Sequence, residues 1–271
     1  MIGTDPDRAP ARPDLTFLRY RGRPRPAASQ PAGNPSTGPA AGQPVAERML
    51  DLSSSPKDAT SGPNSLHPGP ADRPAARRPA YRPSRATAEA PVVLTPKHPA
   101  VTLTRLQSGI GALTLEAACS AAVGDLRLGA SFVLDGGASS LVQYVTGHAG
   151  APRNSARPVI LAGHTRYERI MLDLRQVRSL DRLLVYGFSQ SGGRLNWGGT
   201  LLFTTPTGVR VELPLDRPAA AGVLVLASVY NAGGELTIRA EMELFPGSIR
   251  DAVTAYGFDR ISWLDPATPL N

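Results

Sequence analysis

The sequence contains few of the side chains that build disulfide frameworks and metal centres. Cys119 is the single cysteine among 271 residues, which excludes an internal disulfide framework and suits a reducing compartment. The four histidines are His67, His98, His148 and His164, and no two of them have the spacing of zinc ligands. The sequence therefore predicts neither a zinc site nor a disulfide-stapled fold.

Long apolar segments are missing as well. No apolar run approaches the roughly 18 residues of a transmembrane helix. The first residues, MIGTDPDRAPARPD, have Asp and Pro where a signal peptide needs basic and then apolar residues. We therefore expect a soluble, cytoplasmic protein without a transmembrane segment.

The sequence also lacks the common motifs of nucleophilic catalysis and phosphate binding. Ser-Gly-Gly at 191–193 is not the Gly-x-Ser-x-Gly elbow of a hydrolase. The Gly-rich segment 190–199 has no Lys-Ser/Thr pair of a phosphate-binding loop. His164, Arg166 and Glu168 surround a loop, but nothing in the sequence positions a partner for acid–base work. We expect a protein that is not an enzyme.

Proline and basic charge divide the chain into two parts. Of the 27 prolines, 17 precede residue 92, and this part has 13 Lys and Arg against 8 Asp and Glu. The remainder has 16 against 14 and is close to neutral. Apolar side chains before residue 92 are too sparse to offset the entropy cost of ordering the chain. The sequence predicts a disordered Pro/Ala/Arg-rich extension over residues 1–91 and a folded domain over residues 92–271.

Three segments stand out within the extension. Residues 15–20, LTFLRY, and 45–52, VAERMLDL, are each either a short motif that folds on a partner or a chance cluster. The run from Arg73 to Arg85, RPAARRPAYRPSR, is basic and contains one tyrosine. Such a run can follow the phosphates of a nucleic acid, and it can equally be a solvated linker.

From residue 92 onward, turn signals separate short apolar or alternating segments. Strands are expected over residues 101–106, 112–119, 126–134, 140–145, 167–174, 182–189, 200–205, 209–215, 223–230 and 235–244. No amphipathic helices lie between them, which is typical of an antiparallel β-sandwich of two packed sheets. The fold class expected is therefore all-β.

The order of apolar and polar residues also predicts which strand faces are buried and where a helix forms. Apolar and polar residues alternate in 235–244, so one face of that strand should pack inward. The segment 224–227 is apolar throughout and predicts a strand buried on both faces. A single short C-terminal helix is expected over 248–255, with Ser248 as its cap and Gly257 at its end.

The segment from Gly124 to Gly137, GDLRLGASFVLDGG, has the most specific pattern of the folded part. Asp125 opens an alternating strand that continues into the apolar run 132–134. Asp135, Gly136 and Gly137 then favour a hairpin turn, because they tolerate a positive φ. Carboxylates at the start of a strand and in the following turn could also supply hard oxygen ligands to a cation.

Further segments follow this one in a recognisable order: IMLDLRQVR at 170–178, RLLVYGF at 182–188, and a late strand pair at 226–240. The ordered set resembles the TerD domain of tellurium-resistance and stress-response proteins, in which an Asp-Leu-Asp-Ala-Ser strand precedes an Ile-x-Val-Asp-Leu segment. The short helix near the C-terminus also fits. The resemblance covers roughly residues 97–265 and implies a β-sandwich.

The resemblance implies a function as well as a fold. It implies a non-enzymatic binding or scaffold protein in a bacterial stress response of the tellurite-resistance type, with protein partners from that system. A weak homo-oligomer stays open. A nucleic-acid-binding adaptor that uses the basic run Arg73–Arg85 is an alternative.

The TerD family also builds a calcium site from clustered carboxylates, and here the pattern departs from the family. The second Asp of the motif is Arg127, and the family's acidic loop reads GHAGAPRNSAR at 147–157. Asp125, Asp135 and Glu168 remain as candidate metal ligands. Calcium needs six to eight oxygen ligands, and a guanidinium repels it. We expect a degenerate site and no cofactor, with Asp125 hydrogen-bonded to a turn or paired with Arg127; a calcium-responsive module with a partial site at Asp125 is the alternative.

The loop 190–199, QSGGRLNWGG, is the other candidate site. Arg194, Asn196 and Trp197 could form a recognition tip at one end of the sandwich. In the alternative interpretation, the loop is a long hairpin with Trp197 folded back on the edge of the core.

Overall fold

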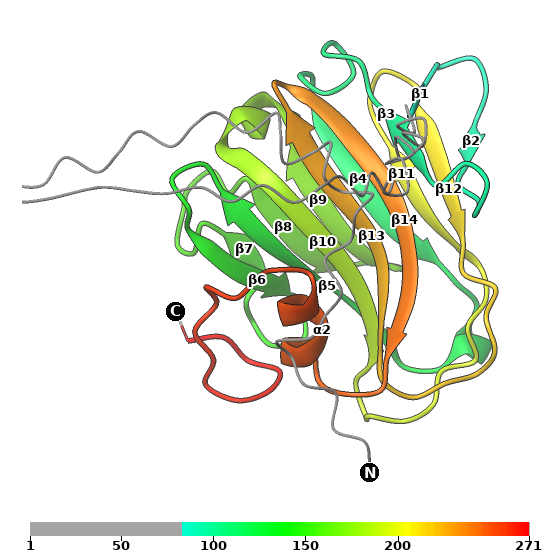
Figure 1. The fold of residues 1–271 in the computed structure, drawn as a ribbon, viewed down its shortest axis with the longest axis vertical. Coiled ribbons are helices and arrows are strands. Elements are labelled where there is room, and N and C mark those ends of the chain that lie inside the picture. Colours follow the sequence, from blue (N-terminus) through cyan, green and yellow to red (C-terminus); the bar gives the residue numbers. More distant parts are fainter. Residues whose placement is uncertain (1–82, 271) are drawn as a thin grey trace, which may run out of the picture. The chain divides into compact units, whose positions relative to one another are not determined.

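The computed structural model describes residues 83–270, which form two β-sheets and a short C-terminal helix (Figure 1). The predicted all-β fold class is confirmed. The expected extension over residues 1–91 lies mostly outside the described residues, as do the segments 15–20 and 45–52 and most of the run Arg73–Arg85.

The first sheet places the strands with the longest apolar runs at its centre. Its order is β1 (Ser84–Arg85), β3 (Ala100–Thr102), β14 (Glu235–Phe245), β13 (Val223–Ala232), β10 (Leu180–Ser189), β5 (Leu126–Leu134) and β6 (Ser139–Gln143). The first seven residues of β13 are all buried, as the apolar run 224–227 predicts. They are buried because the second sheet covers one face of β13 and the C-terminal helix lies against the other.

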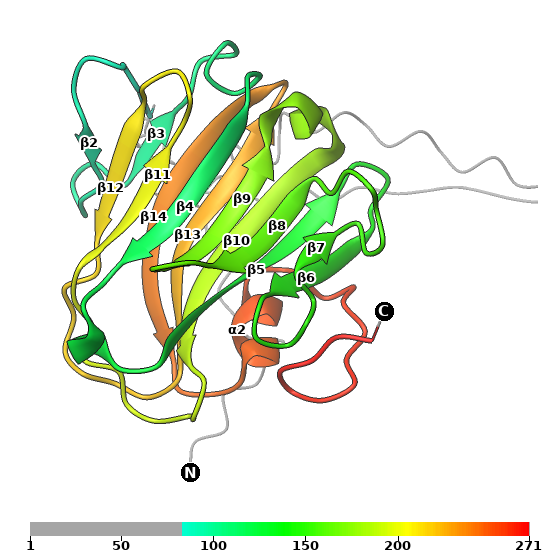
Figure 2. The same ribbon diagram turned by 180° about the vertical axis from the view of Figure 1, so that it is seen from behind.

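The second sheet faces the first (Figure 2). Buried and more exposed residues alternate along its central strands, as in a half-buried sheet. Its order is β2 (Val92–Val93), β12 (Arg210–Pro214), β11 (Thr200–Thr204), β4 (Ala112–Ala118), β9 (Glu168–Asp173), β8 (Ile160–His164) and β7 (Gly150–Ala151). In β4 every second residue is buried, and the others are half-exposed. One face therefore packs on the core and the other faces water.

The main core lies between the two sheets. Leu115 and Ile170 of the second sheet and Leu226 of the first belong to it and are fully buried. Burying one such side chain stabilises the fold by about 1.5–3 kcal/mol relative to leaving it in water.

A second, smaller core lies between the first sheet and the C-terminal helix α2 (Ile249–Ala255). Ser248 caps α2 as expected, with Asp251 completing a reciprocal capping box. Gly257 follows the helix with φ +76°, in the left-handed region that favours glycine. On the sheet side, a Cβ at Gly129 would lie 2.5 Å from the ring of Tyr186, so the close packing of β5 on that ring requires glycine.

Each of the ten expected strands overlaps a strand of the structure, and the unexpected ones lie at or next to sheet edges. β1 and β2 pair in parallel with β3 and β12, although the sequence predicts an antiparallel sandwich. β7 and β8 form a short hairpin that was not expected, and the 3₁₀ helices η3 (Ala121–Val123) and η4 (Leu174–Ser179) were missed too.

The folded part also begins earlier than the expected boundary at Val92. The amide of Ala86 donates a hydrogen bond to the carbonyl of Thr102 at 3.0 Å, and Ala86 is buried. Ser84 and Arg85, which pair with β3, are therefore already part of the first sheet. None of the helices in the described part of the chain has the length and hydropathy needed to span a bilayer.

Candidate functional site

Glu168, the first residue of β9, is the centre of a charged cluster. Only 6% of its side chain is exposed. Its Oε1 atom accepts a hydrogen bond from Nη1 of Arg127 at 3.3 Å and lies 2.8 Å from Nδ1 of His164. Its Oε2 atom accepts from the amide of Leu128 at 3.2 Å. Both carboxylate oxygens are therefore in use.

Strand pairing explains why these residues meet. His164 and Glu168 are direct partners across the hairpin of β8 and β9. Arg127 and Leu128 are in β5 of the other sheet, where pairing with β6 begins only at Gly129. The Leu128 amide therefore lacks a partner in β6, and Glu168 supplies the acceptor. The cluster thus ties the second sheet to the first.

The histidine of this cluster has half of the arrangement that acid–base chemistry needs. Its side chain is 43% exposed, its Nδ1 faces the Glu168 carboxylate, and the Tyr144 ring stacks near it with centroids 6.5 Å apart. Within residues 83–270, no serine, threonine or cysteine hydrogen-bonds to His164. The arrangement orients an imidazole but gives it no nucleophile to activate.

The sequence placed His164 and Glu168 around one loop, and the structure brings their side chains into contact. The sequence could not reveal this contact, because it depends on β8, and β8 was not predicted. Arg166 lies apart from the cluster, with its guanidinium 5.3 Å from the ring centre of Tyr167.

Asp125 is held by neutral donors. The Ser189 hydroxyl donates to Oδ1 at 2.6 Å, and the Ser191 amide donates to Oδ2 at 2.7 Å. The hydrogen bond from Ser189 and those from Ser191 lower the pKa of Asp125, since they stabilise the charged form. Of the two structural roles expected for Asp125, the hydrogen bond to a turn is observed; Arg127 pairs with Glu168 instead.

The three candidate metal ligands do not come together. Asp135 is exposed in the turn after β5, where its amide donates to the carbonyl of Ser179 at 2.7 Å. Asp125 is committed to its serine donors, and Glu168 is committed to Arg127 and His164. No group of three or more His, Cys, Asp or Glu side chains that could hold a metal is found in residues 83–270.

The loop 190–199 is folded back on the sandwich. Trp197 is 7% exposed and packs in the main core, where a Cβ at Gly187 would lie 3.1 Å from its ring. Trp197 as part of an exposed recognition tip is therefore wrong, and its folding back onto the core is observed. The loop is not the hairpin of the alternative interpretation, because it connects β10 of the first sheet to β11 of the second. Arg194 and Asn196 are exposed, and their side chains donate to backbone carbonyls of Ala219 and Ala122.

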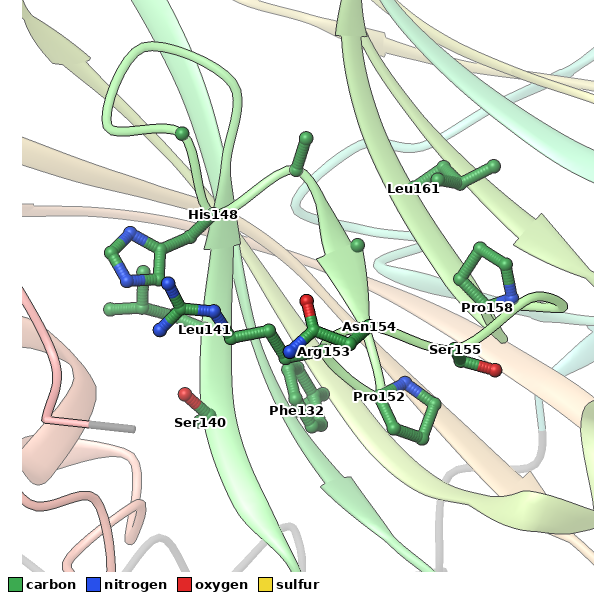
Figure 3. A pocket seen from close by; sticks show the side chains of 13 residues that line it. Phe132, Ser140, Leu141, His148, Pro152, Arg153, Asn154, Ser155, Pro158 and Leu161 are labelled. Atoms are coloured by element: carbon green, nitrogen blue, oxygen red, sulfur yellow. The ribbon is translucent and has the colours of Figure 1, made fainter.

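A cavity of about 320 Å³ lies beside β6, β7 and the start of β8 (Figure 3). Arg153 and His148 line it, together with the apolar side chains of Phe132, Leu141 and Leu161. These residues were not predicted from the sequence to form a site. The available signal was the loop 147–157, which has basic residues and no carboxylate.

Comparison with known proteins adds no identity: the sequence matches neither a protein-family model nor a curated protein. The TerD resemblance therefore stays a prediction drawn from the order of its motifs.

Proposed function

We propose that the protein is a TerD-like binding protein of a bacterial stress response that acts without catalysis and without calcium. One observation carries the calcium-independent part of this proposal: Arg127, where the family motif has its second Asp, forms an ion pair with Glu168. A calcium ion at this place would have to displace a guanidinium from a carboxylate that is almost fully buried. The two-sheet fold is compatible with the family's sandwich.

The same cluster gives no free base for catalysis. Glu168 already has three hydrogen-bond partners, so it orients His164 and holds β5 rather than offering a free base. Protein partners of the stress response are then the expected ligands. We assign the function to the cytoplasm, because a chain with the single cysteine Cys119 suits a reducing compartment.

Calcium titration of the full chain tests the first part. We expect no binding heat up to about 5 mM calcium, which exceeds the dissociation constants of weak extracellular calcium sites. Arg127→Asp should gain calcium-dependent thermal stability, and Arg127→Leu, which removes the charge without adding a carboxylate, should not. Wild-type binding that disappears in Asp125→Ala would instead establish the calcium-responsive module.

The stress-response part needs a cellular test. The full chain, expressed in a tellurite-sensitive bacterium, should raise the tellurite concentration that the cells tolerate. A Leu226→Asp chain, which places a charge in the main core, is the matched control for folding and should give no protection. Unchanged tolerance with a folded wild-type chain present in the cells would contradict the proposal.

A further inference from the structure

The cavity beside β6 and β7 has the composition of a binding site for an organic anion. It lies where both sheets end, since β6 is the last strand of one sheet and β7 the last strand of the other. Its volume of about 320 Å³ is at the lower end of the range of small-molecule sites. A small ligand, rather than a protein segment, fits this space.

The guanidinium of Arg153 gives the cavity a positive charge. Of residues 83–270, no Asp or Glu lines the cavity, whereas Arg153 and His148 both do. Arg153 is exposed, and it forms no hydrogen bond or ion pair with any of residues 83–270. In His148, Nδ1 lies 3.2 Å from the Thr146 hydroxyl, so Nε2 is the ring nitrogen left for a ligand. Figure 3 shows the Arg153 side chain extending toward this imidazole.

The remaining wall is apolar. Phe132 and Leu141 form buried parts of it, and Leu161, which is 37% exposed, borders it from β8. An apolar wall next to a guanidinium and an imidazole favours a ligand that has an apolar body and an anionic end. An inorganic ion has no apolar part to pack against the wall, and a neutral apolar molecule has no anionic group to pair with Arg153.

The loop that carries Arg153 is built to hold its shape. Asn154 has φ +59°, a left-handed conformation that asparagine tolerates better than most residues. The Ser155 amide donates to the carbonyl of Pro152 at 3.2 Å, and the Ser155 hydroxyl accepts from the amide of Arg157 at 3.1 Å. These two hydrogen bonds therefore hold the backbone of the loop around Arg153.

We propose that this cavity binds a small carboxylate with an apolar body, with its carboxylate on Arg153 and His148 and its body against Phe132, Leu141 and Leu161. A guanidinium recognises a carboxylate through two parallel hydrogen bonds, which gives geometric specificity as well as charge. This inference does not depend on the proposed stress-response function, because it concerns only the cavity.

Benzoate is a suitable probe because it has one carboxylate and a compact apolar ring. Titration of the ¹⁵N-labelled full chain should give saturable shifts of amide signals from residues 147–155 and 161. Benzamide, which has nearly the same shape without the charge, should bind at least about tenfold more weakly, since it cannot form the charge-assisted pair. Inorganic phosphate should also bind more weakly than benzoate.

Two variants locate the interaction. Arg153→Gln should weaken benzoate binding by about tenfold or more. The matched control is Arg157→Gln, which removes a charge from the same loop but does not line the cavity, and it should leave binding unchanged. Equal binding by wild type and Arg153→Gln, no saturable shifts with benzoate, or phosphate binding as tight as benzoate would each overturn the proposal. Thermal melting of both variants checks that the fold is intact.

Discussion

Arg127 and Arg153 carry the same charged group in opposite surroundings. Arg127 lies against a buried carboxylate, and its Nε donates to the Gln190 side chain at 2.8 Å. Arg153 lies in a loop whose cavity has no carboxylate among its lining residues. The first guanidinium is part of the fold, because its partners come from β9 and from the turn after β10. The second forms no hydrogen bond or ion pair with the described residues, so its donors can serve a ligand.

The charge of Arg127 therefore contributes to the stability of the fold, whereas the charge of Arg153 can bind a ligand. A buried ion pair contributes little over an apolar pair, but removing one partner is costly because the other stays buried and unpaired. An exposed arginine without a partner contributes little to folding. Mutations in the Arg127–Glu168 pair should therefore change the free energy of unfolding, and mutations at the cavity should change ligand binding.

The largest expected effect comes from Glu168→Ala. This change removes the acceptor of Arg127, His164 and the Leu128 amide, and we expect it to lower the free energy of unfolding by about 3 kcal/mol. Urea denaturation of the full chain measures it. Glu212→Ala is the matched control, because Glu212 pairs with the exposed Arg210 and should cost less than about 1 kcal/mol. Similar losses in both variants would mean that the Glu168 cluster is an ordinary surface pair.

The next effect tests whether the cost arises from the unpaired partner. The double variant Arg127→Leu with Glu168→Leu should be more stable than Glu168→Leu alone by about 1–2 kcal/mol, because no charge is left without its partner. A double-mutant cycle in urea gives this coupling energy. Additive losses would show that the two side chains do not interact.

A carboxylate placed in the cavity should give Arg153 a partner within the protein, as Glu168 is the partner of Arg127. Leu161→Glu brings an acid to the wall that borders Arg153, and we expect benzoate binding to fall about tenfold with little change in stability. Leu161→Gln loses the same apolar surface without adding charge, so its binding should fall less. If the two variants lose affinity equally, the wall rather than the charge controls binding.

The smallest expected effect is the contribution of Asp125 to stability at low pH. Its pKa is lowered in the folded state, so its contribution is present above the unfolded pKa of about 3.9 and is lost as the pH falls through the folded value. We expect Asp125→Asn to reduce stability at pH 7 by less than about 1 kcal/mol and to flatten the loss of stability below pH 4. Urea midpoints between about pH 2 and pH 7 check it. A steeper acid loss in the variant would contradict this assignment.

The sequence predicted the strands that carry a strong periodic pattern and missed those that depend on neighbours. The sequence of β14 alternates and residues 224–227 of β13 are all apolar, so both strands were readable without a structure. β1, β2 and β7 have only two residues each, which is too short for a period to appear. In β8, the sequence ILAGH has one polar residue at its end and a glycine, which weakens the strand pattern.

The sequence showed which kinds of side chain stand at the site, but it did not show which of them contact one another. The replacement of an acidic position by Arg127 was visible, and it predicted a degenerate metal site. Its partner was not visible, because Glu168 lies 41 positions away on a strand of the other sheet. The cavity could not be predicted for the same reason, because β5, β6 and the loop 147–157 meet there only after folding.

The short strands at the sheet borders have a consequence for self-association. The outermost strands are β1, β6, β2 and β7, and three of them have only two residues. Each offers few backbone amides and carbonyls to a neighbouring molecule, which is a common protection against edge-to-edge polymerisation. The fourth, β6, borders the cavity loop, and its last residue, Gln143, already exchanges backbone contacts with His148. The sandwich thus carries a large β-structure with little tendency to extend its sheets from one molecule to the next.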